Sequence, residues 1–487
     1  MKINNISVIL FTGMMATGTV LAQTDIPVRE ALWQYGQVDG DNSTGHSVSM
    51  DDQGRLYVGE FIKTGVGKYI VGFSVFDTVK KEKKWFVSLP GAEENNRSML
   101  ITAPIIDTER QRLWAVTRDS RIYLYDISGD TPPRLLKQTQ LGERKDSRRD
   151  FTRAETTILP DDGQLIVTTC GRQPDGNPEP EIYSRLFRVN SSLTIVDAQE
   201  LGVMQNIPGS SDSYCKSFDK DMLKYHSTIP VPGLAYIPRY NVIDTAGERV
   251  NPITYRFADG YINEWDVGGH TAIPFATGTD LTRYYIADMG ELKRQKANEQ
   301  PEKIFTTGES KLGQFATLYS DTLLMVTKKS VAASSGHYDT FLTALDKDQD
   351  EHAAPLWQLP LSTFDTDLHD GYFRNRPTKP VVSQKGTLYI ADQDALTAIN
   401  VKNQQPLWRY VVPENSRPNE MVLDLQGNIW MTQCLKQPSD AAADYETMVK
   451  SANCQLVVLG GDGTTQMPGS LSERGDQENT GRLYSGK

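Results

Sequence analysis

Short apolar runs alternate with polar turns along most of the chain, and one stretch shows the repeating unit clearly. Residues 378–382 and 387–391 are apolar runs separated by a turn signal that ends in Gly386. A third run covers 395–400 and a fourth covers 407–412, each after a polar turn. Four short runs separated in this way predict four antiparallel strands in a meander. A lone four-stranded sheet cannot bury both faces, so the pattern predicts a ring of several such sheets.

Similar apolar runs surround four tryptophans, Trp33, Trp85, Trp357 and Trp408. Self-similarity of this kind is typical of repeat architectures. Counting the starts of the units predicts an all-β, eight-bladed β-propeller. Seven blades are the alternative, because residues 203–310 are the least regular part. The expected units start near residues 47, 101, 156, 227, 271, 315, 378 and 420.

The run around Trp33 resembles the fourth strand of a blade, yet no blade precedes it. The last unit has its first three strands at 420–432 and 454–459 and lacks a fourth. We therefore expect residues 29–36 to complete that unit from the other end of the chain. Such a strand closes the ring and removes an exposed sheet edge.

Residues 398–403 (AINVKN) lead through a turn into residues 406–410 (PLWRY). This order, a third strand followed by a Leu-Trp-basic-aromatic strand, resembles the PQQ-like repeat of quinoprotein-type propellers. The chain has no adjacent Cys-Cys pair, which departs from the alcohol-dehydrogenase branch of those proteins. The resemblance implies a fold and no particular activity, because propellers host many functions.

The N-terminus has the pattern of an export signal. A mostly apolar stretch runs from residue 6 to residue 21 and ends in small residues before Gln23. It is too short for a membrane span and is followed by polar sequence, so residues 1–22 are predicted to be a secretory signal peptide. The protein is expected to be periplasmic or secreted.

The mature chain, residues 23–487, is expected to be one domain, with blades over about 29–470 and a flexible C-terminal tail over about 471–487. No later stretch approaches about 20 apolar residues, so the mature protein is not expected to span a membrane. The net charge of −11 argues against a nucleic-acid partner, which calls for a basic surface.

The chain has four cysteines, Cys170, Cys215, Cys434 and Cys454. An even number in an exported protein predicts two disulfides, for which three pairings exist. Cys434 ends the second predicted strand of the last blade and Cys454 begins the third, so these two should join neighbouring strands. Cys170 ends the second strand of its own blade, and Cys215 lies in the connection to the next blade, on the same face. We therefore expect Cys434–Cys454 and Cys170–Cys215.

The loops that enter the inner strands should line one mouth of the central channel, and they carry several cationic or titratable side chains. Such a set suits an anionic ligand, either a carboxylate or a phosphate. The alternative is that the arginines tie adjacent blades together by bonding loop carbonyls and carboxylates such as Glu155 and Glu420. The expected partner is accordingly a protein or a small anionic ligand at one face of the ring. The residues concerned are His46, Arg97, Arg153, His226, His270, Arg376 and Arg417.

Residues 346–351 (DKDQDE) space the carboxylates of Asp346, Asp348 and Asp350 like the start of a calcium loop. The glycine that such loops use for the sharp turn is missing, and Trp357 stands where the twelfth-position glutamate would be. An acidic turn is therefore favoured, with a calcium site as the alternative.

No HExxH, GxSxG or P-loop motif occurs in the chain. We therefore expect an exported, non-catalytic binding or scaffolding protein of the cell envelope or exterior. The inserts at 171–183 and 435–453 would be its recognition loops. The alternative is an enzyme with its site in the channel mouth, either a quinone-dependent oxidoreductase or a hydrolase or lyase that acts on an anionic substrate. A quinone cofactor would call for a tryptophan platform at the channel, and the tryptophans mostly fall at outer or second-strand positions.

Overall fold

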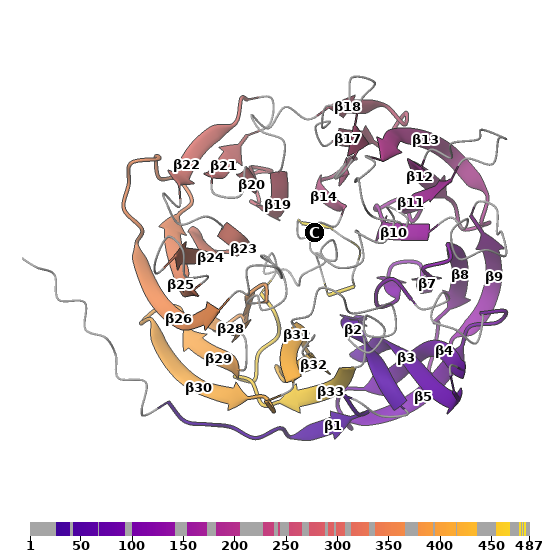
Figure 1. Cartoon of the computed structure of the whole chain (residues 1–487), viewed down its shortest axis with the longest axis horizontal. Coiled ribbons are helices and arrows are strands. Elements are labelled where there is room, and N and C mark those ends of the chain that lie inside the picture. Colours follow the sequence, from indigo (N-terminus) through magenta and orange to yellow (C-terminus); the bar gives the residue numbers. More distant parts are fainter. Residues whose placement is uncertain are drawn as a thin grey trace, which may run out of the picture.

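The described part of the chain folds as strands and turns, without a helix, and its sheets stand around a common centre (Figure 1). Each sheet has an inner strand beside that centre and an outer strand at the rim. A ring of antiparallel, mostly four-stranded sheets in this arrangement is a β-propeller. The computed structural model describes residues 26–38, 42–66, 68–92, 100–141, 153–172, 182–204, 227–237, 242–243, 253–264, 272–287, 291–296, 299–306, 313–330, 337–365, 378–392, 395–414, 416–435, 454–467, 477–478, 480 and 482–483.

The unit that the sequence shows most clearly is confirmed. β27 (Val381–Val382), β28 (Thr387–Asp392), β29 (Ala395–Asn400) and β30 (Gln405–Val411) form a four-stranded antiparallel sheet in chain order. Gly386 has a φ of +82°, which suits the tight turn between the first two strands.

Five further sheets follow the same order from the inner to the outer strand. The first holds β6 (Ile105–Asp107), β7 (Arg112–Val116), β8 (Arg121–Asp126) and β9 (Arg134–Gln140). The second holds β10 (Arg153–Ile158), β11 (Leu165–Arg172), β12 (Ile182–Val189), β13 (Ile195–Met204) and the added β16 (Val242–Ile243). The third holds β14 (Thr228–Val231), β15 (Leu234–Ile237), β17 (Ile253–Arg256) and β18 (Ile262–Glu264). The fourth holds β19 (Ala272–Thr277), β20 (Arg283–Ala287), β21 (Glu291–Gln295) and β22 (Glu302–Thr306), and the fifth holds β23 (Gly313–Tyr319), β24 (Thr322–Ser330), β25 (His337–Asp346) and β26 (Trp357–Asp365).

The remaining sheet joins the two ends of the chain and has eight strands. The described structure therefore has seven sheets and not the eight separate ones that we expected. The reason is a single residue pair, Thr44 opposite Cys454, which merges the first and last units. β1 pairs antiparallel with β33, with Trp33 opposite Val458. The strands of this sheet are β31 (Ser416–Leu423), β32 (Ile429–Leu435), β33 (Cys454–Leu459), β2 (Asn42–Met50), β3 (Arg55–Gly65), β4 (Lys68–Asp77), β5 (Glu82–Ser88) and β1 (Trp33–Tyr35).

The hydrophobic core lies between neighbouring sheets. Tyr57 and Phe73 of β3 and β4 pack in one buried cluster with Leu113 and Tyr125 of the next sheet. Both faces of a sheet are covered in this way, so successive residues such as those of 56–58 are all buried. Burial of apolar surface on both faces is what a lone meander lacks, and it explains why the units occur as a ring.

The N-terminal segment lies along the rim across two sheets (Figure 1). The Arg29 N–H donates to the Arg409 carbonyl of β30 at 2.8 Å, and the Leu32 N–H donates to Val458 of β33 at 2.8 Å. The Arg29 guanidinium lies 4.5 Å from the centroid of the Trp408 ring, a cation–π contact. Strand β1 thus lies beside β33 at the rim.

The predicted signal peptide, residues 1–22, lies outside the described residues. Within the described ranges, no helix has the length and apolar character that crossing a membrane needs.

Candidate functional site

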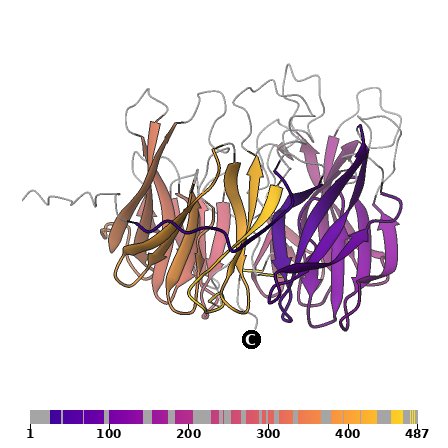
Figure 2. The same cartoon turned by 90° about the horizontal axis from the view of Figure 1, so that it is seen from below.

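Figure 2 shows the strands running between two faces of the ring, and these faces differ in the length of chain that joins successive strands. On one face, which we call the short-turn face, brief turns join inner to second strands and third to fourth strands, as at 51–54 and 78–81. On the opposite, long-connection face, the chain between strands is much longer, as at 205–227, 366–380 and 436–453. Long connections on a rigid scaffold are where binding residues concentrate, so the long-connection face is the candidate binding surface.

An aspartate organises several of the short turns. The Asp51 carboxylate accepts hydrogen bonds from the backbone N–H groups of Gln53 and Arg55, at 3.0 and 2.9 Å. Asp424 occupies the same position in the last unit and accepts from two backbone N–H groups in the same way. Gly54 follows Asp51 with a φ of +74°, a conformation that glycine adopts without strain. These hydrogen bonds and this glycine keep the turns of the short-turn face tight.

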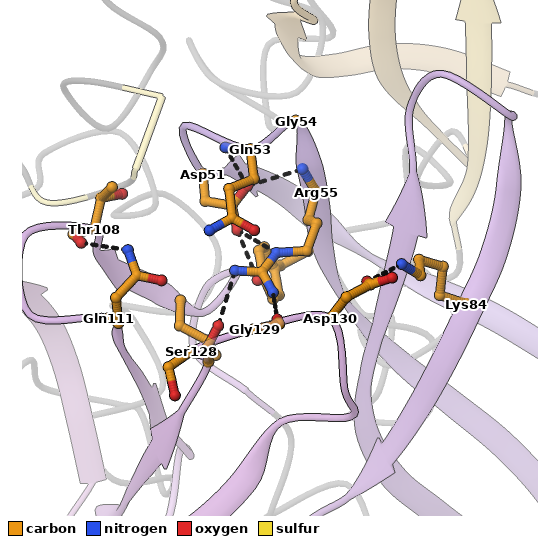
Figure 3. A network of polar contacts seen from close by, with 12 residues as sticks. Asp51, Gln53, Gly54, Arg55, Lys84, Thr108, Gln111, Ser128, Gly129 and Asp130 are labelled. Carbon is orange, nitrogen blue, oxygen red and sulfur yellow. Dashed lines mark hydrogen bonds and ion pairs between the residues drawn. The ribbon is translucent and has the colours of Figure 1, made fainter.

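Arg55 ties the first two units together at this face (Figure 3). Its Nε donates to Asp51 Oδ2 at 2.6 Å, while its Nη1 and Nη2 donate to the carbonyls of Gly129 and Ile127 at 2.8 and 3.0 Å. Lys84 pairs with the nearby Asp130. Arg55 is buried, and its guanidinium is held by protein acceptors from two sheets. An arginine in this protein can therefore serve as a link between sheets.

The sequence-predicted site residues fall in two groups. His46, Arg153 and Arg417 lie in the inner strands β2, β10 and β31. Arg153 and Arg417 are at the ends where their strands begin, beside the long-connection face, whereas His46 is in the middle of β2. The convergence of the whole set stays a prediction, because the other members lie outside the described residues. Those are Arg97, His226, His270 and Arg376.

Two of the arginines occupy equivalent positions in different sheets. Arg153 lies opposite Cys170 in the β10–β11 ladder, and Arg417 lies opposite Cys434 in the β31–β32 ladder. An inner-strand arginine beside a second-strand cysteine is therefore a repeated feature of the ring.

The disulfide between Cys434 and Cys454 is confirmed, and it joins β32 to β33 in the interior of the protein. Cys170 is also disulfide-bonded. Its predicted partner, Cys215, lies outside the described residues. Among the residues that the structure describes, no cysteine is free.

A buried lysine lies at the inner wall, and the sequence analysis missed it. Lys379 is 5% exposed, and its Nζ donates to the carbonyl of Phe275 at 3.1 Å. Lys379 precedes β27, whereas Phe275 is on β19, so this bond joins two sheets that have the sheet of β23–β26 between them in the ring (Figure 1). The sequence feature that could have revealed this lysine is its position, as a charged residue at the start of an apolar run that forms an inner strand.

Hydroxyl groups link neighbouring inner strands along the same wall. Ser47 Oγ and Thr102 Oγ1 lie 3.3 Å apart and share a hydrogen bond, and Thr156 Oγ1 and Ser227 Oγ do so at 2.7 Å. In each pair the two residues come from adjacent units. Polar side chains of the inner strands thus bind one sheet to the next, which is the structural role considered for the arginines.

The C-terminal tail meets the inner strands at the short-turn face. The tail was expected to be flexible over about 471–487, but at its described positions it is hydrogen-bonded to the ring. In Figure 1 two short yellow pieces of it lie near the centre, beside β2 and β14. The sequence offered little warning, because these bonds use the backbone and the tail is polar. The bonds run from Met50 N to Gln477 O (2.8 Å), Ile106 N to Glu478 O (2.9 Å), Leu159 N to Thr480 O (2.8 Å) and Leu483 N to Ile229 O (3.0 Å).

A glycine-rich turn after β33 directs the chain toward the centre. A Cβ atom on Gly461 would lie 1.9 Å from the carbonyl oxygen of Gly427, so only glycine fits there. The next residue, Asp462, accepts hydrogen bonds from the hydroxyls of Ser383 and Thr464, at 2.5 and 2.7 Å. Burial alone would raise the pKa of Asp462, but these hydrogen bonds hold it below its ordinary value. The turn is therefore anchored by a charged carboxylate at neutral pH.

The acidic segment at 346–351 is a turn. Asp346 accepts a hydrogen bond from the Asp348 N–H at 2.8 Å, and Asp350 accepts one from the His352 N–H at 2.9 Å. Arg294 lies 3.6 Å from the Asp348 carboxylate. The three carboxylates do not converge, and across the described residues no group of three or more His, Cys, Asp or Glu is placed to hold a metal ion. The calcium alternative stays a prediction.

Comparison with known proteins gives structural likeness only. No protein-family model matches the chain. No curated protein matches it either. Matching solved structures include the Dos1 propeller, at 10% identity over 89% of this chain and 96% of that chain, with a TM-score of 0.49. Sqt1 from Chaetomium thermophilum matches at 10% identity over 88% and 99%, with a TM-score of 0.49. The calcium-binding protein regucalcin from Agrobacterium tumefaciens matches at 10% over 89% and 95%, with a TM-score of 0.32. Because these identities and TM-scores are low, the assignment of the fold as a propeller rests on the arrangement of the sheets described above.

Proposed function

We propose that the protein is an exported, non-catalytic propeller that binds or scaffolds another molecule of the cell envelope or exterior through its long-connection face. The difference between the two faces carries this proposal. Most connections of the short-turn face are tight turns, and residues 477, 478, 480, 482 and 483 lie at its centre. The longest connections, 205–227, 366–380 and 436–453, leave from the other face, where a rigid ring can present them as a recognition surface.

We infer further that the ring has eight blades of the PQQ-like type. Dividing the eight-stranded sheet at the pair Thr44–Cys454 gives two four-stranded units, one of β2–β5 and one of β31–β33 with β1. In this count β1 is the fourth strand of the last blade and closes the ring. The repeat at 398–410 supports the PQQ-like assignment. Counting the eight-stranded sheet as one blade gives the alternative of seven.

Export is supported by the disulfide chemistry. The bond between Cys434 and Cys454 is of a kind that persists in oxidising compartments, such as the periplasm or the exterior. Sequencing the N-terminus of the protein isolated from its natural source tests this inference. We expect the mature chain to begin at Gln23 and to contain no titratable thiol. A chain that retains Met1 and reacts with thiol reagents contradicts export.

The partner is proposed to be a protein or a small anionic ligand. Arg153 and Arg417 begin equivalent inner strands beneath this face, and the Lys379 ammonium lies in the same channel wall. Cationic groups at one mouth attract carboxylate or phosphate groups, even on a protein whose net charge is −11.

A pair of exposed valines provides the decisive experiment. Val66 lies in the turn before β4 and Val79 in the turn after it, so the same strand carries them to opposite faces. Each is replaced in turn by a photo-reactive phenylalanine derivative in the exported protein. A partner should cross-link from position 66 and not from position 79. Equal cross-linking from both positions, or cross-linking from 79 alone, contradicts the assignment of the binding face.

The alternative is an enzyme with its site in the channel mouth, and the buried Lys379 is the observation that favours it. A hydrolase or lyase acting on an anionic substrate would use such a cation for binding. A quinone-dependent oxidoreductase is less well supported, because the described tryptophans lie on second or outer strands. They are Trp33, Trp85, Trp114, Trp357, Trp408 and Trp430. Absorbance and intact mass of the purified protein test for a bound quinone directly.

A further inference from the structure

We propose that the centre of the short-turn face is a binding site for a peptide segment, and that the chain's own C-terminal segment is its occupant, through residues 477, 478, 480, 482 and 483. This site is separate from the long-connection face, so the inference does not rest on the proposed function.

The site is built from the edges of inner strands. An inner strand is the edge of its sheet, and its outward N–H and C=O groups face the centre of the ring. Met50 of β2, Ile106 of β6 and Leu159 after β10 each donate one N–H to a tail carbonyl, at 2.8 to 2.9 Å. In the next sheet the ring accepts instead of donating, because the carbonyl of Ile229 in β14 accepts from the N–H of Leu483 at 3.0 Å. Peptide recognition through strand edges normally uses one sheet. Here four neighbouring sheets each contribute one bond.

Side chains of the tail add selectivity to these backbone bonds. Leu483 is 2% exposed and Thr480 is fully buried, so both are enclosed by the ring. Arg482 Nε donates to the Leu159 carbonyl at 3.2 Å and lies 3.2 Å from the Asp161 carboxylate. The ligand class is therefore a peptide with a small hydroxyl residue, followed two residues later by a basic residue and then by a leucine.

The ring does not depend on this segment for its own strand pairing. Met50 lies opposite Leu56 in the β2–β3 ladder, and Ile106 lies opposite Leu113 in the β6–β7 ladder. These ladders remain when the tail leaves, and the edge N–H groups that it uncovers can be hydrated. The site should therefore be able to empty while the sheets stay folded.

A chain ending at residue 476 tests the proposal with a synthetic peptide of residues 477–487. We expect the shortened chain to unfold cooperatively and to bind the labelled peptide saturably in fluorescence anisotropy. The full-length chain should bind the same peptide at least about 10-fold more weakly, because its tethered tail competes at high effective concentration. A peptide carrying Leu483→Asp should lose binding, and Asp161→Asn in the shortened chain should weaken binding of the unaltered peptide.

Hydrogen exchange of the full-length chain covers the case in which the shortened chain does not fold. The amides of Met50, Ile106 and Leu159 should then exchange through local opening, with a lower free energy than the β3 amide of Tyr57. If these amides exchange only on global unfolding and the shortened chain does not fold, the tail is part of the cooperative core and the proposal is overturned. A folded shortened chain that binds no peptide overturns it equally.

Discussion

Replacing Lys83 with methionine should destabilise the protein more than replacing its partner, Glu60, with glutamine. Glu60 of β3 is fully buried, whereas the side chain of Lys83 on β5 is 23% exposed. Lys83 Nζ lies 2.8 Å from Glu60 Oε2, and the Tyr35 hydroxyl of β1 donates to Glu60 Oε1 at 2.7 Å. Ser74 of β4 also donates to this carboxylate. The network thus joins the N-terminal strand to three strands of the first unit.

The two substitutions differ because they leave different groups behind. Lys83→Met leaves a carboxylate buried with only the hydroxyls of Tyr35 and Ser74 as donors. Loss of one member of a buried ion pair costs about 3–5 kcal/mol. Glu60→Gln leaves an ammonium that can reach water and a carbonyl oxygen that can still accept from it, so it should cost about 1–2 kcal/mol. The double variant removes both charges, and its cost should fall below the sum of the two by about 1–3 kcal/mol.

Urea unfolding, followed by tryptophan fluorescence, measures these differences. Trp33 reports on the region directly, because its ring centroid lies 6.0 Å from that of Tyr35. Lys80→Met is the matched control, since Lys80 is 64% exposed and its carboxylate neighbour, Glu82, is 3.6 Å away at the surface. That control should change the stability by less than about 0.5 kcal/mol.

The reasoning is refuted if Lys83→Met costs no more than Lys80→Met. It is also refuted if Lys83→Met and Glu60→Gln cost the same, because the argument depends on a buried carboxylate and a partly exposed ammonium.

Three further outcomes are expected. Burial alone would lower the pKa of Lys83, but hydrogen bonds to its carboxylate partner raise it above the ordinary 10.5. The stability that this ion pair contributes is therefore complete below about pH 10 and is lost as the pH rises through the raised pKa of Lys83. In urea titrations, the difference in free energy of unfolding between the wild type and Lys83→Met should therefore shrink only at alkaline pH. Gly461→Ala, which places a Cβ 1.9 Å from a backbone carbonyl, should destabilise the turn after β33 more than Gly463→Ala, where the only cost is the φ of +80° and a Cβ meets nothing within 4 Å. Replacing Cys434 and Cys454 with serine opens a link of sequence separation 20 and should lower the free energy of unfolding by about 3 kcal/mol.

For each of these three predictions, one experimental result would contradict it. A wild-type advantage that shrinks near neutral pH contradicts the raised lysine pKa. Equal melting temperatures for the two glycine variants contradict the close approach of the turns. Unchanged stability of the double serine variant contradicts a constraining disulfide.

The sequence predicted the parts of the fold that depend on side-chain pattern. Strands β28–β30 follow from short apolar runs between turn signals, and Cys434–Cys454 follows from the strand order. The merging of the first and last units was not predictable, because it depends on one backbone pair at Thr44. Side-chain pattern carries no information about such a contact.

The candidate site was predictable only in part, for a related reason. Arg153 and Arg417 lie at the starts of inner strands, because blade alignment fixes backbone positions. Lys379 was missed, since its burial depends on how the inner strands pack around the centre. The docking of residues 477–483 was missed because edge N–H groups recognise the backbone of a polar segment.

The two ends of the chain meet the ring in different ways, and this predicts different effects of truncation. Strand β1 bonds along one ladder, and Trp33 packs against Phe76 and Trp430 with ring centroids 5.8 and 5.6 Å apart. Removing residues 26–36 exposes this cluster and leaves the edge of β33 open. The loss should be several kcal/mol, since burial of one large apolar side chain contributes about 1.5–3 kcal/mol, and the open edge should promote self-association on gel filtration. Removing residues 477–487 takes only one backbone-to-backbone bond from each of four sheets, together with the contacts of Arg482 to Leu159 and Asp161, so that variant should stay monomeric and cooperatively folded. If the C-terminal truncation proves the more damaging of the two, the ring depends on its axial segment, and the distinction drawn here between a ladder and single bonds is wrong.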